Sequence, residues 1–258
     1  MDLSGARAKL ERAKEHLQLM DDTVHDVRLG SGGDSSLVLG GFYRSASRSF
    51  ELRVLSMPQY PLTEWGTVLG DYVQNLRSAL DHAAYQLVAS GSEPSDAALR
   101  RSQFPICDTR DMFDSEVPRR LSGVVAPRAM SVVEEAQPFK YHNIYVSPTR
   151  ILRELSNRDK HRLLIPLLLA PDDLQASSVQ VHGAEVAAVT TAPHVPLIEG
   201  GTVAEVWLQE VRANQVPTIS IEELPIYMSL GEPAGYASVW LNAMMGRVER
   251  VLDHLDAL

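Results

Sequence analysis

The stretch TEWGTVLGDYVQNLRSALDHAAYQLVAS, residues 63–90, predicts one long helix in the middle of the chain. Its apolar residues recur at spacings of three and four, and they fall on one side of the helix: Leu69, Leu76, Leu80, Ala83 and Leu87. The segment SGSEPSD that follows contains glycine and proline and predicts the end of the helix. A helix of this length needs partners that cover its apolar side.

Three further segments have helical periodicity, namely residues 3–28, 127–166 and 235–258. The second of them contains two helices. The stretch PRAMSVVEEAQPF predicts one, with Pro127 just before its first turn and Pro138 past its end. The other begins further on, where Ser147 is a plausible N-cap and Pro148 a suitable first helical residue. Pro166 predicts the end of that helix or a kink in it. These segments predict a bundle of about four main helices.

Two other segments, residues 36–56 and 174–230, predict β-structure. The first has two apolar runs around a polar turn at residues 44–48, the pattern of a β-hairpin, and it follows the chain-breaking stretch GSGGDSS. The second alternates in polarity and is rich in valine, isoleucine and threonine, which is typical of an antiparallel sheet.

The predicted fold class is therefore α+β. We expect a single domain over residues 1–258, in which the N-terminal hairpin and the later antiparallel sheet accompany the helical bundle. The later sheet would be an insertion before the C-terminal helix. A chain of 258 residues, 45% of them apolar, can bury a sizeable core without disulfides.

Composition predicts a cytoplasmic protein. The chain has one cysteine, Cys107, which excludes an internal disulfide framework and is expected to be a small core residue. We expect no association with a membrane, because no tract approaches the ~20 apolar residues that cross a bilayer. The net charge of −9 argues against broad electrostatic attraction to nucleic acid.

The charge is nevertheless uneven, because residues 140–162 carry six basic and two acidic side chains. A basic patch on an acidic protein can bind an anion locally, whereas a solvated helix face would show the same composition. Within it, the segment NRDKHR, residues 157–162, forms the most concentrated cluster.

A polar stripe on the long helix has an unusual composition. It consists of Asp71, Asn75, Ser78 and His82, which fall within about 60° of one another. Asp, Asn and Ser are poor helix formers, so we expect either an ordinary surface stripe or one that faces a ligand, a second subunit or other protein. Arg77 and Asp81, at positions i and i+4, are expected to form a surface ion pair contributing about 0.3–0.5 kcal/mol.

The residues Arg77-Ser-Ala-Leu-Asp-His82 resemble the R-x4-H motif of the HEPN superfamily. This resemblance implies a helical bundle that often dimerises and, in the active members, a metal-independent ribonuclease. It would make His82 the general acid or base, Arg77 the group that holds the scissile phosphate, and Asn75 and Asp81 orienting groups. The chain departs from the motif at Ser78, where Asn, Asp or His is more typical, and the β-segments have no counterpart in a minimal HEPN domain.

A larger part of the chain, about two thirds, resembles a widespread uncharacterised bacterial protein family. That resemblance implies no activity. The stretches that carry it are ARAKLERAKEHL, GDYVQNLRSALDH, FPI, QPF and NRDKHRLL.

Geometry complicates the catalytic hypothesis, because Arg77 and His82 lie about 140° apart around one helix. A second copy of the chain could reunite them. So could the NRDKHR segment, which would add His161 as a further catalytic residue, unless His161 simply faces solvent at the helix end. The same segment would supply groups that bind the substrate: Asn157, Arg158, Lys160 and Arg162.

The function predicted from these features is metal-independent cleavage or binding of RNA, or binding of another phosphate-bearing ligand, with a homodimer as a possible assembly. We expect no cofactor and no metal, since no H-x3-H, H-E-x-x-H or Cys/His spacing is present. The alternative is a non-catalytic interaction or regulatory module. In that case the polar stripe and the basic cluster form a subunit interface or a buried polar network.

Overall fold

The computed structural model describes residues 1–28, 37–91, 94–124, 126–170, 174–192, 194–212, 215–221, 227–231 and 236–258. They form a mixed α+β structure with antiparallel sheets, as the sequence predicts. The GSGGDSS stretch lies outside these residues.

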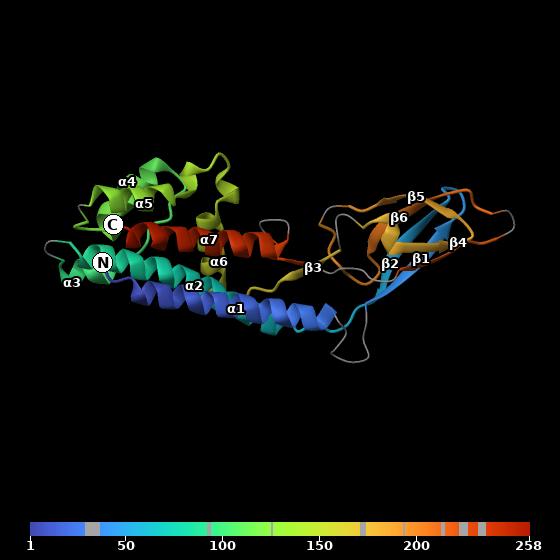
Figure 1. Ribbon diagram of the computed structural model, residues 1–258, viewed down its shortest axis with the longest axis horizontal. Helices are drawn as coiled ribbons and strands as arrows, with labels where there is room; N and C mark the ends of the chain where they lie inside the picture. Colours follow the sequence, from blue (N-terminus) through green and yellow to red (C-terminus); the bar gives the residue numbers. More distant parts are fainter. Residues whose placement is uncertain are drawn as a thin grey trace. The chain divides into compact units, whose positions relative to one another are not determined.

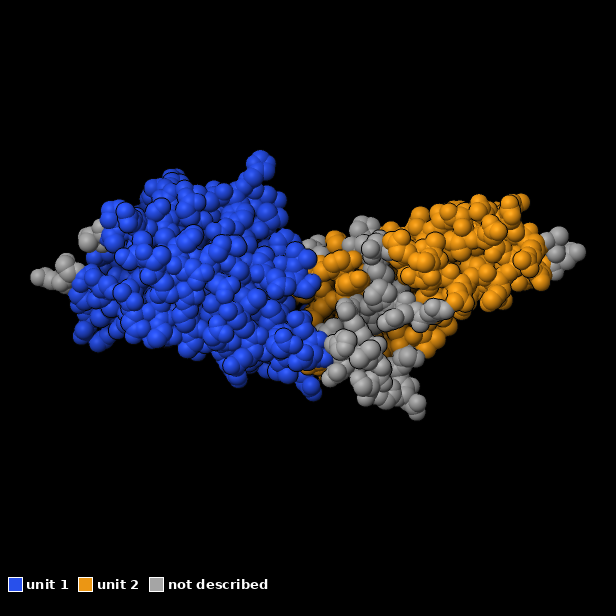
Figure 2. All heavy atoms as spheres, viewed as in Figure 1, with its two compact units in different colours: residues 1–22, 62–165, 238–258 blue, residues 23–61, 166–237 orange. Residues whose placement is uncertain are grey.

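The chain, predicted as a single domain, divides into two compact units, which Figure 2 shows in different colours. We call them the helical unit (residues 1–22, 62–165 and 238–258) and the β unit (residues 23–61 and 166–237). Each unit is assembled from separate pieces of chain, because helices pack with helices and strands pair with strands across long intervening segments.

The described residues form seven α-helices rather than about four main ones (Figure 1). Five lie close to predicted positions: α1 (Ser4–Arg28), α2 (Leu62–Ala89), α5 (Pro127–Glu135), α6 (Pro148–Asp159) and α7 (Ala237–Asp256). α6 ends at Asp159, before the predicted end at Pro166. The other two helices are short, α3 (Asp96–Arg101) and α4 (Arg110–Arg120), and there are two 3-10 turns, η1 (Pro138–Lys140) and η2 (Ile144–Val146).

The apolar side of α2 forms the centre of the helical unit, and all five of its predicted core residues are buried. α7 returns to this core after the β unit, since the Tyr72 hydroxyl of α2 donates a buried 2.6 Å hydrogen bond to the Leu241 carbonyl of α7. α1 is tied to α7 at the surface by Arg7, which forms ion pairs with Asp253 and Asp256.

Two glycines of α2 allow the end of α6 and the chain after it to approach closely. A Cβ added to Gly66 would overlap the Leu164 carbonyl oxygen, and one added to Gly70 would overlap the Asp159 carboxylate. Gln74, one turn further along α2, donates to the Ser156 carbonyl at 3.1 Å and to Asp159 Oδ2 at 3.0 Å. These contacts fix the C-terminal end of α6 against α2.

The β unit contains a four-stranded antiparallel sheet in the order β1-β2-β6-β5. Its strands are β1 (Val38–Arg44), β2 (Ser49–Ser56), β5 (Glu185–Thr190) and β6 (Thr202–Gln209). β1 and β2 form the predicted hairpin, and β2 pairs with β6, so the hairpin and the later segment share one sheet.

Two further antiparallel pairs complete the β unit. They join β3 (Leu167–Leu169) to β8 (Tyr227–Ser229), and β4 (Val179–His182) to β7 (Thr218–Ile221). The 3-10 turn η3 (Ala176–Ser178) precedes β4. A Cβ on Gly41 of β1 would overlap the Ile219 side chain, so β7 packs against the sheet at β1. Among the described residues, no helix has the length and apolar character needed to span a bilayer.

Candidate functional site

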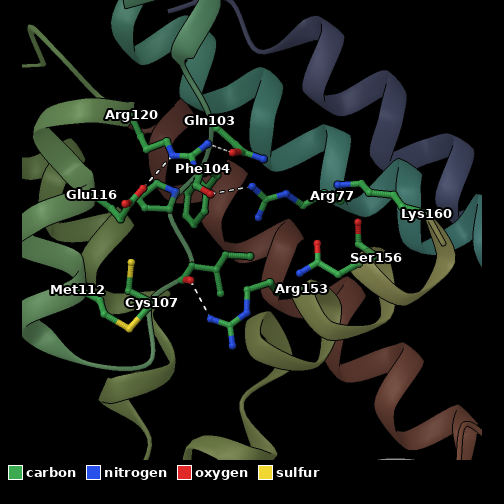
Figure 3. A pocket seen from close by; sticks show the side chains of 13 residues that line it. Arg77, Gln103, Phe104, Cys107, Met112, Glu116, Arg120, Arg153, Ser156 and Lys160 are labelled. Atoms are coloured by element: carbon green, nitrogen blue, oxygen red, sulfur yellow. Dashed lines mark hydrogen bonds and ion pairs between the residues drawn. The ribbon is translucent and has the colours of Figure 1, made fainter.

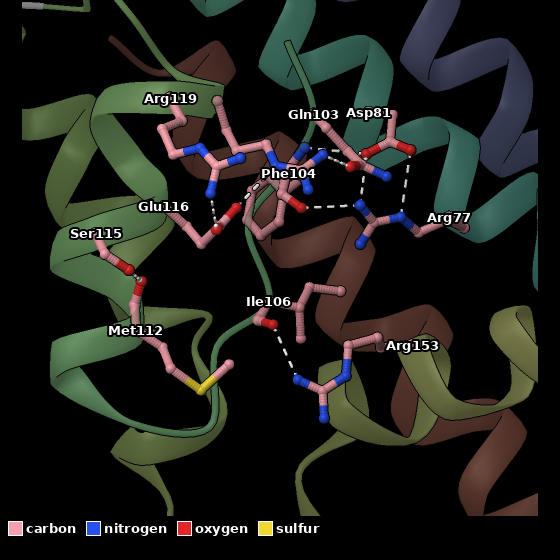
Figure 4. A network of polar contacts seen from close by, with 11 residues as sticks. Arg77, Asp81, Gln103, Phe104, Ile106, Met112, Ser115, Glu116, Arg119 and Arg153 are labelled. Carbon is pink, nitrogen blue, oxygen red and sulfur yellow. Dashed lines mark hydrogen bonds and ion pairs between the residues drawn. The ribbon is translucent and has the colours of Figure 1, made fainter. Parts of the chain in front are cut away.

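An extended segment between α3 and α4, residues 103–107, crosses the helical unit beside α2 and α6 and contains the FPI stretch. It has no neighbouring strand in the described structure. Instead, α2 satisfies both backbone polar groups of Phe104: its N–H donates to Asp81 Oδ1 at 2.9 Å, and its carbonyl accepts from Arg77 Nη2 at 2.9 Å (Figure 4). Asp81 and Arg77 therefore bind the segment much as a strand partner would.

Two further side chains hold the rest of the segment. Gln137, in the QPF stretch, donates to the Pro105 carbonyl at 2.8 Å and accepts from the Cys107 N–H at 2.9 Å. Arg153 of α6 donates from Nη1 to the Ile106 carbonyl at 2.9 Å. Stretches that are far apart in the sequence thus meet around one short piece of backbone.

The Arg77–Asp81 pair is consequently not the surface ion pair expected from its spacing. The side chain of Arg77 is only 10% exposed and that of Asp81 29% exposed. Burial lowers the pKa of the Arg77 guanidinium, and the nearby charges of Arg120 and Arg153 lower it further, whereas Asp81 acts in the opposite direction. Three cationic groups are therefore held close together in this part of the helical unit.

A pocket of about 320 Å³ opens beside the extended segment (Figure 3). Four of its lining residues are basic and one is acidic, although the whole chain carries a net charge of −9. The lining consists of Arg77, Gln103, Phe104, Pro105, Ile106, Cys107, Met112, Glu116, Arg120, Arg153, Ser156, Asn157 and Lys160.

The basic residues differ in how completely they are neutralised. Arg120 pairs with Glu116, which also lines the pocket, and Arg153 pairs with Asp108 and Glu154. Lys160 makes no ion pair or side-chain hydrogen bond to any residue that the structure describes. The positive charge that remains unpaired in the pocket is therefore at the α6 wall.

Two other polar groups at this wall lack partners within the described part of the chain. One is the side-chain amide of Asn157. The other is Nη1 of Arg77, since only Nε and Nη2 of that guanidinium are bonded, and Figure 4 shows the remaining nitrogen directed away from Asp81 and Phe104. With Lys160, these groups offer free N–H donors to the same pocket.

Apart from Gln103 and Ser156, the remaining lining is apolar and centres on the extended segment and α4. Phe104, Pro105 and Ile106 provide one surface, and the half-exposed Met112 lies on the α4 side together with the buried Cys107. Burial raises the pKa of the Cys107 thiol, so this thiol stays protonated over a wider pH range than an exposed one.

The structure brings together only some of the residues predicted to form the site. Arg77, Asn157 and Lys160 line the pocket. Asp81 is not in the lining, but its carboxylate accepts hydrogen bonds from Arg77 Nε and from the Phe104 N–H. Arg158, His161 and Arg162 are not among the lining residues, and the last two are exposed.

His82 and Asn75 lie elsewhere on α2. A Cβ added to Gly5 of α1 would lie 2.9 Å from His82 Nδ1, which places the imidazole against α1 rather than in the pocket. Asn75 donates to the Asp71 carbonyl one turn back in the same helix. Within one copy of the chain, His82 and Arg77 therefore do not face a common space.

Sequence reasoning missed several residues of the site, above all Arg120, Met112 and Gln137. Arg120 and Met112 belong to α4. The sequence did not predict this helix, because Phe113 is its one buried residue and it has no apolar stripe. Arg153 lies within the basic stretch of residues 140–162 that the sequence singled out, but its contact with the Ile106 carbonyl depends on tertiary structure.

No described group of three or more His, Cys, Asp or Glu side chains could hold a metal ion. No family model, curated protein or solved structure matches the chain. The two family resemblances stay predictions, and the pocket itself is the basis for a functional proposal.

Proposed function

We propose that this protein is a binding module whose helical unit holds a phosphate-bearing ligand in the pocket between α2, α4 and α6. This retains the ligand class predicted from the sequence and assigns it to a different set of residues. The observation that carries the proposal is the convergence of Arg77 Nη1, the Asn157 amide and Lys160, all without partners among the described residues, on one cavity.

Electrostatics favours an anion as the occupant. Arg77 is 8% exposed and lies near two other guanidinium groups, so its charge is both desolvated and repelled. A bound anion would offset both effects, and charge-assisted hydrogen bonds are about twice as strong as neutral ones. A guanidinium already held by Asp81 and Phe104 also loses little side-chain entropy when it binds a ligand.

The proposal does not include catalysis by the two predicted histidines, because neither lies at the pocket. General acid–base catalysis at neutral pH requires a proton-exchanging group within hydrogen-bond reach of the reacting atom. Neither His82 nor His161 lines the pocket. RNA cleavage by these histidines, an assembly that supplies them from a second copy, and a cytoplasmic location stay predictions from the sequence.

A titration calorimetry experiment tests the proposal with phenyl phosphate as the probe. Wild type is compared with Lys160→Gln, which removes the unpaired ammonium of the pocket, and with Arg162→Gln as the matched control. Arg162 carries the same charge two residues away and is exposed like Lys160, but it lies outside the lining. We expect Lys160→Gln to weaken binding about tenfold, as the loss of one charge-assisted hydrogen bond would.

We expect Arg162→Gln to change the affinity less than twofold. Equal weakening by both variants would mean that the probe responds to the general charge of residues 157–162. Absence of binding to the wild type would end the proposal. Circular dichroism of both variants checks that the exposed substitutions leave the helical unit folded.

A further inference from the structure

The pocket has a polar wall and an apolar surface, and this asymmetry defines a narrower ligand class. Figure 3 shows Arg77, Ser156 and Lys160 on one side of Phe104, and Met112, Cys107 and Glu116 on the other. We infer that the pocket binds a phosphate monoester with a flat apolar body, its phosphate at the α2–α6 wall and its body along residues 104–106 toward Met112. The inference rests on the function proposed above.

The donor arrangement at the wall suits a terminal phosphate. The donor groups are Arg77 Nη1 of α2, the Asn157 amide of α6, and Lys160, which directly follows α6. A phosphate monoester presents three acceptor oxygens and a charge of about −1.5 to −2 at neutral pH. A diester has only two non-bridging oxygens and one negative charge, so it would neutralise less of the positive charge of Arg77 and Lys160.

The α4 side of the pocket is better matched to a neutral body. The charge of Arg120 is balanced there by Glu116, whose carboxylate bonds Arg120 Nε at 2.9 Å and Arg119 Nη1 at 3.0 Å. Met112 is 45% exposed and lies next to the surface formed by the extended segment. An unbranched, polarizable side chain of this kind packs well against a flat ring.

The cavity volume indicates the size of the part of a ligand that the pocket would enclose. At about 320 Å³ the pocket lies at the lower end of the range for small-molecule sites, about 300–1,000 Å³. One phosphate with one ring system fills such a space. A mononucleotide and the 5′-phosphorylated end of an RNA both carry a phosphate monoester, with a base as the flat group beyond the ribose, whereas the interior of an RNA strand offers only diesters.

The test compares the affinities of five probes for the full chain by titration calorimetry. Phenyl phosphate is a monoester that carries an apolar ring, and methyl phenyl phosphate is a diester that carries the same ring. Inorganic phosphate is an anion without a ring. Uridine 5′-monophosphate is then compared with a 5′-phosphorylated RNA trinucleotide, to separate a free nucleotide from an RNA end.

We expect phenyl phosphate to bind about tenfold more tightly than either methyl phenyl phosphate or inorganic phosphate. Met112→Ser should remove most of the advantage over inorganic phosphate and leave the affinity for inorganic phosphate itself unchanged. Met112 is exposed and α4 has its core contact at Phe113, so this variant is expected to fold.

The possible failures are distinguishable. If phenyl phosphate and the diester bind equally well, or if inorganic phosphate matches phenyl phosphate, the monoester-with-body inference is wrong and the phosphate-binding function stands. If none of the probes binds, both fail. Preference for the trinucleotide over the mononucleotide would assign the site to RNA ends, and the reverse preference would assign it to free nucleotides.

Discussion

Gly70 of α2 lies directly beneath the carboxylate of Asp159, the last residue of α6, and leaves no room there for a Cβ. The same carboxylate accepts a hydrogen bond from Gln74 at 3.0 Å. Because Lys160 follows Asp159 immediately, the glycine determines how closely the α6 wall of the pocket approaches α2.

One turn earlier in α2, Gly66 meets backbone rather than the end of a side chain, since a Cβ added there would overlap the Leu164 carbonyl oxygen. Gly66→Ala should therefore destabilise the helical unit, although alanine is the better helix former. We expect a loss of about 1–3 kcal/mol from overpacking, measured by urea denaturation. Gly246→Ala in α7 is the matched control, because the nearest atom to its added Cβ is Arg250 Nη1 at 3.7 Å. This control should gain up to about 1 kcal/mol, and a similar gain for Gly66→Ala would contradict the close approach to α2 of the chain that follows α6.

The Arg77–Asp81 pair should contribute far more to the free energy of unfolding than an exposed pair of the same spacing. Asp81→Ala removes the partner of a buried guanidinium and the acceptor for the Phe104 N–H, so we expect a loss of about 2–4 kcal/mol. Asp114→Ala, in the Arg110–Asp114 pair with side chains 55% and 56% exposed, should cost less than about 1 kcal/mol. Equal losses in urea denaturation would show that the Asp81 contacts contribute no more than a surface pair.

Acid should weaken the β unit through Glu51. Hydrogen bonds from Arg53 and Thr202 are the main cause of the fall in the pKa of this carboxyl to about 2. Since the folded pKa lies below the usual 4.5, the stabilisation is complete above about pH 4.5 and is lost as the pH falls toward 2. In acid titrations followed by near-UV circular dichroism, Glu51→Gln should lose less stability over that interval than wild type. An unchanged acid dependence would exclude Glu51 as its source.

Cys107 can report occupancy of the pocket because it is the only cysteine in the chain and one of the lining residues. Its raised thiol pKa predicts slow alkylation by iodoacetamide at pH 7.5 and faster reaction as the pH rises, since the thiolate is the reactive form. Saturating phenyl phosphate should slow the reaction in wild type, measured by mass spectrometry. At the same ligand concentration Lys160→Gln should show little protection, and equal protection in both proteins would place the ligand elsewhere.

His82→Ala separates binding from the cleavage predicted by the HEPN resemblance. Because His82 lies against Gly5 of α1, we expect this variant to bind phenyl phosphate within twofold of wild type. Both proteins are then incubated with cellular RNA in the presence of a chelator. Cleavage by wild type that disappears in folded His82→Ala would support a catalytic role for this histidine.

Regular periodicity made much of the fold predictable. The long helix was expected over residues 63–90 and is observed over Leu62–Ala89, because its apolar stripe is continuous. The hairpin turn was expected at residues 44–48, and β1 and β2 flank residues 45–48. α4 was not predicted, because its eleven residues include Pro118 and bury only Phe113.

The candidate site was less predictable because it is assembled from separate elements. The spacing of Arg77 and Asp81 predicts an ion pair but not its burial, which depends on where residues 103–107 pass. Helical geometry did show that Arg77 and His82 point in different directions, and the structure places them accordingly. No local pattern could indicate that Arg120, Arg153 and Lys160 share a cavity.

The position of α7 after the β unit has a consequence for synthesis on the ribosome. α2 ends at Ala89 and α7, which supplies the acceptor for the Tyr72 hydroxyl, begins at Ala237. At a translation rate of about 5–20 residues per second, α2 waits roughly 7–30 s for this partner. During that interval α2 exposes apolar surface that a chaperone could bind. Slow codons in the β unit would lengthen the interval.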